Sequence, residues 1–117
     1  MRVSPELAVI VPTFNEQANV EEVASRVAAA LEGIAWELIF VDDDSPDGTA
    51  ALVQRLSRRD PRVRVLRRVR RRGLSSACVE GMLASSAPFL AVMDADLQHD
   101  ERILPQMLAA VRDGGLD

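Results

Sequence analysis

The sequence contains no lysine, and it has one cysteine and one histidine among 117 residues. Without lysine, mechanisms that need an amine are excluded, such as Schiff-base catalysis or the lysine of a phosphate-binding loop. With Cys78 as the one cysteine, neither an intrachain disulfide nor a cysteine-rich zinc site can form. The one histidine, His99, gives no basis for a Ser-His-Asp or Cys-His arrangement, and we expect it at the surface or at a helix end.

Long hydrophobic runs are also missing. The first apolar run, Val9–Val11, stops at Pro12, so it is too short for the apolar region of a signal peptide. No run approaches the ~20 residues that cross a bilayer. We therefore expect a soluble protein on the cytoplasmic side. The net charge of -4 gives no general case for nucleic-acid binding, and 48% apolar residues suffice for the core of one small domain.

The charge is unevenly distributed. Residues 55–72 contain ten arginines and one aspartate, whereas the chain on either side is acidic. This basic segment has two interpretations: a solvated helix and edge strand, or a surface that faces nucleotide phosphate or an anionic membrane. Arg70, Arg71 and Arg72 are the best placed for such a contact, because they directly precede Gly73 and the next expected helix.

Apolar patterning predicts alternating strands and helices. Four short runs are expected to be strands: 7–11, 37–41, 62–66 and 89–93. The third alternates and is expected at a sheet edge; the others are expected to be buried on both faces. Helical stripes follow each strand, and Asn15 and Asp47 are expected to cap the first two helices. Leu74, Ala77, Cys78, Gly81 and Met82 form the third stripe, with Cys78 in the core, and Trp36 should pack at a sheet end. This order predicts an α/β fold, an open parallel sheet with helices on both faces.

Acidic residues follow three of the expected strands. In an open parallel sheet, ligands bind beyond the carboxyl ends of the strands. Six carboxylates are predicted at this edge: Glu16, Asp42, Asp43, Asp44, Asp94 and Asp96. Such a concentration of like charge is costly unless a cation or a donor-rich ligand offsets it.

Two of these acidic groups suggest particular chemistry. Asp94, Asp96 and Gln98 would point the same way on an extended segment, where their oxygens would suit Mg²⁺ or Mn²⁺. The alternative is that they cap the following helix. In the other group, Asp42 is the best candidate to accept hydrogen bonds from a ribose or a base, although Asp-Ser-Pro-Asp-Gly is also strong turn chemistry.

Four segments in order carry a resemblance to a known family. They are Val9–Glu16, Val41–Thr49, Gly73–Ala77 and Val92–His99. Together they resemble the motifs of family 2 glycosyltransferases. The Ser-Pro-Asp-Gly-Thr and Asp-Ala-Asp-Leu-Gln-His stretches are similar to those of the dolichyl-phosphate (polyprenyl-phosphate) mannose synthases within it.

This resemblance implies a GT-A-like (Rossmann-like) fold and inverting transfer of a hexose, such as mannose, to a polyprenyl phosphate. The donor would be a nucleotide-diphosphate sugar, either GDP-mannose or a UDP-hexose. The residues implied to bind it are Pro12, Phe14, Glu16, Asp42, Asp43, Asp94 and Ala95. Asp96 and Gln98 would hold Mg²⁺ or Mn²⁺, and Asp96 would be catalytic. Phe14 stands where tyrosine is common in the family.

The resemblance covers essentially the whole chain, yet catalytic domains of this family are longer. We therefore expect residues 1–117 to be the nucleotide-binding half of a truncated GT-A domain, able to bind donor and metal but poor at transfer. One alternative is an inactive fragment that oligomerises through an exposed sheet edge. A receiver-like signalling domain is disfavoured, since such domains need a lysine and place the acidic cluster after the first strand.

Overall fold

The computed structural model describes residues 4–69, 73–95, 104–106 and 109. The elements in chain order are β1 Leu7–Thr13, α1 Gln17–Ala30, β2 Trp36–Asp42, α2 Thr49–Arg59, β3 Val63–Arg67, α3 Leu74–Leu83 and β4 Phe89–Val92. Residues 104–106 and 109 are helical and fall within the last helix that the sequence predicts. The predicted alternation of strands and helices is therefore confirmed.

The strands form one parallel sheet in the order β3-β2-β1-β4. The register places Thr13 beside Asp42, and Asp42 beside Arg67. These three residues form a row across the carboxyl ends of β1, β2 and β3. Because all the strands are parallel, the loops that follow them leave the sheet at this same edge.

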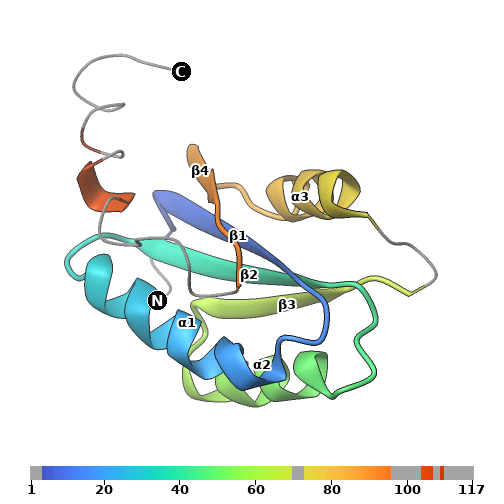
Figure 1. The fold of residues 1–117 in the computed structure, drawn as a ribbon. Helices are drawn as coiled ribbons and strands as arrows, with labels where there is room; N and C mark the ends of the chain where they lie inside the picture. The colour runs from blue at the N-terminus through green and yellow to red at the C-terminus, as the bar shows by residue number, and fades with distance from the viewer. Residues whose placement is uncertain (1–3, 70–72, 96–103, 107–108, 110–117) are drawn as a thin grey trace.

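Helices cover both faces of the sheet, as expected. Figure 1 shows α1 and α2 on one side and α3 on the other. Valines of α1 and α2 pack with alternate residues of the strands in the larger core. The smaller core lies under α3 and contains Ala8, Ile10, Ile39, Val41 and Ala77. None of the described helices combines the length and the apolar character that crossing a membrane requires.

Helix α3 approaches the sheet closely because of Gly81. A Cβ atom at this position would lie 2.4 Å from Ile10 Cγ2 and 2.9 Å from Val41 Cγ2, so any larger residue would force these buried side chains to shift. The predicted apolar face of this helix nevertheless includes residues that are not buried. Leu74 is 65% exposed and Cys78 is only partly buried, so placing Cys78 in the core was wrong. The helix meets the sheet mainly through the small residues Ala77 and Gly81.

The two outer strands differ from the two central ones. The strand order confirms the predicted edge position of β3, in which only the first residue, Val63, is buried. The prediction that β4 is buried on both faces was wrong, since Leu90 and Val92 are 42% and 40% exposed. In the described part of the chain β4 is the other edge strand, and α3 packs on β1 and β2 rather than over it. Trp36 is buried at the start of β2, at a sheet end as predicted.

Candidate functional site

The carboxyl edge of the sheet brings together most of the residues that the sequence singled out. Pro12, Phe14 and Glu16 lie at the end of β1 and just beyond it. Asp42 ends β2, Asp43 follows it, and Asp94 and Ala95 come shortly after β4. Asp96 and Gln98, the predicted metal ligands, lie outside the described residues, as do Arg70–Arg72 and His99, which was expected at the surface or at a helix end.

The loop after β2 holds the start of α1. The backbone N–H of Asn15 donates to Ser45 Oγ at 2.8 Å, and that of Gln17 donates to Asp47 Oδ2 at 3.2 Å. The prediction that Asn15 caps α1 was wrong: Asn15 has φ 56°, in the left-handed region, and Glu16 is the N-cap residue. Orphan amides at the helix start are satisfied by a segment about 30 residues away in sequence, which local patterning could not reveal.

Asp47 joins two helix starts. Besides the amide of Gln17, its carboxylate accepts the backbone N–H of Thr49 at 3.0 Å and the Thr49 hydroxyl. Burial opposes ionisation of Asp47, but these hydrogen bonds from Thr49 and Gln17 outweigh it and lower the pKa of the carboxyl group. Asp47 therefore satisfies a backbone amide at the start of α2 and another at the start of α1, but the prediction that it caps α2 was wrong by one residue, because Gly48 is the N-cap residue.

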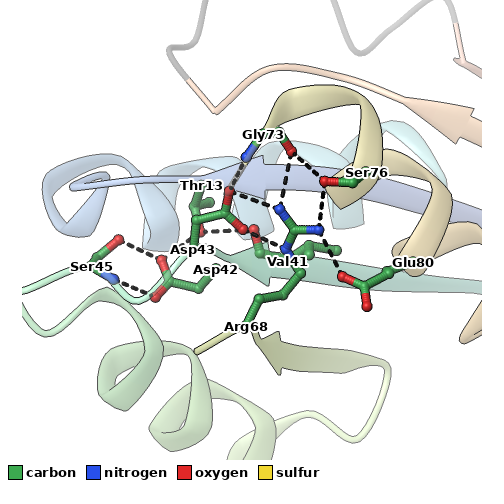
Figure 2. A network of polar contacts seen from close by, with 9 residues as sticks. All are labelled: Thr13, Val41, Asp42, Asp43, Ser45, Arg68, Gly73, Ser76 and Glu80. Atoms are coloured by element: carbon green, nitrogen blue, oxygen red, sulfur yellow. Dashed lines mark hydrogen bonds and ion pairs between the residues drawn. The ribbon is translucent and has the colours of Figure 1, made fainter. Parts of the chain in front are cut away.

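Asp42 is completely buried. Its Oδ1 accepts a hydrogen bond from the Thr13 hydroxyl at 2.9 Å and another from the Ser45 hydroxyl, while its Oδ2 accepts the Ser45 backbone N–H at 2.9 Å. Figure 2 shows Asp42 between Thr13 and Ser45. In this arrangement Asp42 shapes the loop after β2, and its side chain does not reach solvent.

Asp43 has a different partner, the guanidinium of Arg68. Arg68 Nε lies 2.6 Å from Asp43 Oδ1, and Arg68 Nη2 lies 3.0 Å from Asp43 Oδ2, which is a bidentate pair. The backbone N–H of Gly73 also donates to Asp43 Oδ2 at 3.1 Å. The Asp43 side chain keeps 13% exposure, so of the two adjacent aspartates it is the one that solvent reaches.

The basic segment is largely paired inside the molecule. Arg62 pairs with Asp60 and lies 4.2 Å from the centre of the Trp36 ring, and Arg64 pairs with Glu37. The hydrogen bonds between Asp60 and Arg62 lower the pKa of the Asp60 carboxyl and raise that of the Arg62 guanidinium. Among the described residues, these arginines neutralise the protein's own carboxylates and do not form one patch that faces an external anion.

The same pairing bears on the expected repulsion at the carboxyl edge. Asp43 and Asp44 are each paired with an arginine, and Asp42 is held by hydroxyl and amide donors. The chain itself therefore compensates three of the six carboxylates. Charge accumulation alone is a weaker argument for a bound cation than the sequence suggested.

Asp94 and Ala95 are the described residues next to the predicted metal site. Asp94 is exposed just beyond the end of β4, where a carboxylate could meet a ligand, and Ala95 beside it is buried. In residues 4–69, 73–95, 104–106 and 109, no three histidine, cysteine or acidic side chains are grouped to hold a metal ion. Asp94 fits a divalent cation in its chemistry and position, while the predicted ligands Asp96 and Gln98 stay a prediction.

Phe14 and Glu16 are accessible beside this edge. Phe14 is 42% exposed, and Glu16 is half-buried with its carboxylate accepting the Asn19 side-chain amide at 3.1 Å. Pro12 is half-buried within β1. An exposed aromatic ring next to carboxylates can stack on a flat ring while the oxygens accept hydrogen bonds, which suits a nucleoside.

Sequence reasoning missed Thr13, Ser45 and Arg68 as parts of this site. Thr13 and Ser45 stood inside recognised motifs but carried no charge to draw attention. Arg68 was one of ten arginines in the basic segment, and nothing local separates it from Arg67. Alternation along a strand would have indicated only that Arg67 and Arg68 point to opposite faces of the sheet, one of which α3 covers.

Comparison with known proteins places the chain in a family. The sequence model for Glycosyl transferase family 2 matches residues 8–117. A dolichol-phosphate mannosyltransferase from Pyrococcus furiosus is 45% identical over 109 residues, which are 93% of this chain and 31% of the relative. A dolichol-phosphate mannosyltransferase from Saccharomyces cerevisiae is 37% identical, over 94% of this chain and 42% of the relative. The chain thus spans less than half the length of these relatives.

Solved structures share the fold. A mannosyltransferase from Pyrobaculum calidifontis, in complex with GDP-Man and Mn²⁺, has a TM-score of 0.72 and 26% identity, covering 94% of this chain and 32% of that one. Glucosyl-3-phosphoglycerate synthase from Mycobacterium tuberculosis, in complex with Mn²⁺ and UDP, has a TM-score of 0.70 and 22% identity, covering 92% and 39%. The GT-A-like fold is confirmed. Since the family model matches nearly the whole sequence and the sheet has the expected architecture, this chain belongs to glycosyl transferase family 2.

Proposed function

We propose that this chain is the donor-binding part of a glycosyltransferase that transfers a hexose, mannose in the first instance, from a nucleotide-diphosphate sugar to a polyprenyl phosphate with inversion. The observation that carries the proposal is the 45% identity to a dolichol-phosphate mannosyltransferase across 93% of the chain. Another relative, 35% identical, is a dodecaprenyl-phosphate galacturonate synthase from Rhizobium johnstonii, so these two relatives are named for different sugars and both for a polyprenyl-type phosphate.

The site residues divide between nucleoside and diphosphate. We assign Pro12, Phe14 and Glu16 to the nucleoside pocket, with Phe14 as the exposed ring. Asp43 is preferred to Asp42 for the contact with base or ribose, because Asp42 is fully buried whereas the Asp43 side chain keeps 13% exposure. Asp94 and Ala95 would lie against the nucleotide, near the sugar-bearing phosphates.

A divalent cation completes the proposal. Asp96, Gln98 and the nearby Asp94 would hold Mg²⁺ or Mn²⁺, and Mn²⁺ accompanies the nucleotide in two of the structural neighbours. When bound, the cation neutralises the diphosphate leaving group. A lipid phosphate is already anionic, so the protein needs little general-base catalysis and acts mainly by orienting the donor and stabilising developing charge. Such an acceptor also implies work at the cytoplasmic face of a membrane.

Calorimetric titration tests this proposal. GDP-mannose, UDP-glucose and UDP-GlcNAc are each titrated with and without Mn²⁺. We expect one nucleotide to bind in a metal-dependent manner, and Asp96→Ala to abolish that dependence. Arg67→Met serves as a control, because the ion pair of Arg67 with Asp44 is exposed and is the one ion pair of Arg67 among the described residues. Absence of binding by all three nucleotides, with a folded wild-type protein, would refute the donor-binding role.

A second candidate is self-association through the sheet edge. It is favoured by β4, an edge strand in the described structure whose Leu90 and Val92 are exposed. Sedimentation of the wild type and of Leu90→Glu over a range of concentrations tests it. A monomer at every concentration would eliminate this candidate, whereas a dimer that Leu90→Glu dissociates would support it.

A further inference from the structure

Arg68 is the largest fully buried side chain in the described structure, with 1% exposure. A guanidinium has five N–H donors in a fixed plane, and Arg68 makes five hydrogen bonds. Two go to Asp43, and the others go to the Gly73 carbonyl at 3.1 Å, Ser76 Oγ at 2.9 Å and Glu80 Oε2 at 2.7 Å. The two carboxylates raise the pKa of Arg68 well above its ordinary value, so it is cationic at every relevant pH.

These bonds join three separate elements. Arg68 follows β3, Asp43 follows β2, and Gly73, Ser76 and Glu80 belong to α3 and its start. The backbone N–H of Arg68 also donates to the carbonyl of Asp42 at 2.8 Å. Figure 2 shows the guanidinium between Asp43 on one side and Glu80 on the other. One side chain therefore fixes the carboxyl end of β2 to the start of α3.

We infer that Arg68 is a positioning residue for nucleotide binding, acting through Asp43; this rests on the proposed function. Two parallel N–H···O bonds define the plane of the Asp43 carboxylate, and the cation keeps it ionised. A carboxylate held in one orientation loses less conformational entropy when a base or ribose binds. The partly exposed Asp43 is thus set in place by a residue that itself never reaches the ligand.

Glu80 provides the control that separates positioning from stability. It binds the same guanidinium, on Nη1, but it lies on α3 and away from the loop after β2. Glu80→Gln should weaken the packing of α3 and leave the bidentate contact to Asp43 intact. Arg68→Lys keeps a positive charge but cannot form that bidentate contact. A purely structural role predicts that both variants affect binding only as much as they affect stability.

The experiment measures Kd for GDP-mannose and UDP-glucose with Mn²⁺, together with Tm, for wild type, Arg68→Lys, Glu80→Gln, Asp43→Asn and the double variant of Arg68→Lys with Asp43→Asn. We expect Arg68→Lys to weaken the affinity by about 10-fold or more, as the loss of a charged hydrogen bond does. Glu80→Gln should lower Tm and change Kd less than about twofold. In the Asp43→Asn background, Arg68→Lys should produce no further loss.

Equal effects of Arg68→Lys and Glu80→Gln on Kd would overturn the inference, as would a full effect of Arg68→Lys in the Asp43→Asn background. If Arg68→Lys does not fold, Asp43→Asn and Glu80→Gln decide: weaker binding by the first alone supports the inference, and equal binding refutes it. A wild-type protein that binds neither nucleotide refutes the proposed function and this inference together, whereas binding unaffected by the Arg68 network refutes the inference alone.

Discussion

Arg67 and Arg68 are neighbours at the end of β3, and each pairs with one of two neighbouring aspartates after β2. Arg67 Nε donates to Asp44 at 3.0 Å, with the two side chains 57% and 37% exposed. Arg68 pairs with Asp43 with exposures of 1% and 13%, and it has a second carboxylate, Glu80. The two pairs have the same chemistry and adjacent positions, yet one is in water and the other is inside the protein.

The difference shows that burial decides what an ion pair does. An exposed pair gains little, because water screens the attraction and long side chains lose freedom. A buried pair has lost its hydration, so its value lies in the geometry that it enforces and in the penalty for breaking it. The partners account for the contrast, since the Arg68 side chain is bound by Ser76 and Glu80 of α3, whereas the Arg67 side chain pairs with Asp44 in an exposed position.

Removing the buried cation should have the largest effect. Arg68→Met leaves Asp43 and Glu80 partly buried without their cation, and we expect the free energy of unfolding to fall by ~3–5 kcal/mol. Urea unfolding followed by circular dichroism measures it. Arg67→Met is the matched variant one residue away. Similar losses in the two variants would show that burial does not separate the pairs.

Asp42 extends the comparison to a buried carboxylate with no arginine among its described hydrogen bonds. Thr13→Val removes the hydroxyl that donates to Asp42 Oδ1 at 2.9 Å, and we expect a loss of ~1–3 kcal/mol in the free energy of unfolding. Thr13→Ser retains the hydroxyl and should lose much less. The same urea titration compares them, and an equal cost for both would assign the effect to the lost shape of threonine rather than to the hydrogen bond.

Asp47 is a carboxylate held by backbone amides and a hydroxyl. Asp47→Ala leaves amides at the starts of α1 and α2 without their acceptor, and we expect a loss of ~1 kcal/mol at neutral pH. Because folding lowers the pKa of Asp47 from its ordinary value of 3.8, its contribution is present above that pH. The contribution is lost as the pH falls through the folded-state pKa. Urea unfolding of both proteins from pH 6 down to pH 2.5 should therefore show their difference shrinking. A difference that stays constant would contradict a charge-dependent role.

The exposed pair should give the smallest effect. We expect Arg67→Met to change the free energy of unfolding by less than ~0.5 kcal/mol. In 1 M salt, which screens exposed charges, this difference from the wild type should decrease further. Urea unfolding at low and high salt checks both. A loss above ~1 kcal/mol that salt does not reduce would mean that this exposed ion pair stabilises the fold more than exposed pairs ordinarily do.

Much of the fold followed from local pattern. The apolar runs ending at Thr13 and Asp42 are strands because continuous β-branched and aromatic residues suit a sheet covered on both faces. The edge position of β3 followed from its alternation. The strand β4 was misjudged because an apolar run cannot reveal whether a helix covers both its faces, and that depends on where α3 lies.

The candidate site was predictable in place but not in internal detail. Acidic residues at strand ends identified the carboxyl edge, since parallel strands bring their ends together. Which aspartate is accessible could not be predicted. Asp42 and Asp43 are adjacent and identical in type, and they differ only because Thr13 and Ser45 enclose one while Arg68 and Gly73 hold the other at the surface.

By itself, the sequence determined the order of strands and helices, the edge of the sheet that carries the site and the family to which the chain belongs, because these depend on periodicity and on motifs read along the chain. The absence of lysine also left arginine as the side-chain cation of every ion pair described here. Only the tertiary structure decided which arginine is buried, which aspartate it holds and which loop caps α1. Those outcomes depend on contacts between segments about 25 to 30 residues apart, and on which face of the sheet α3 covers.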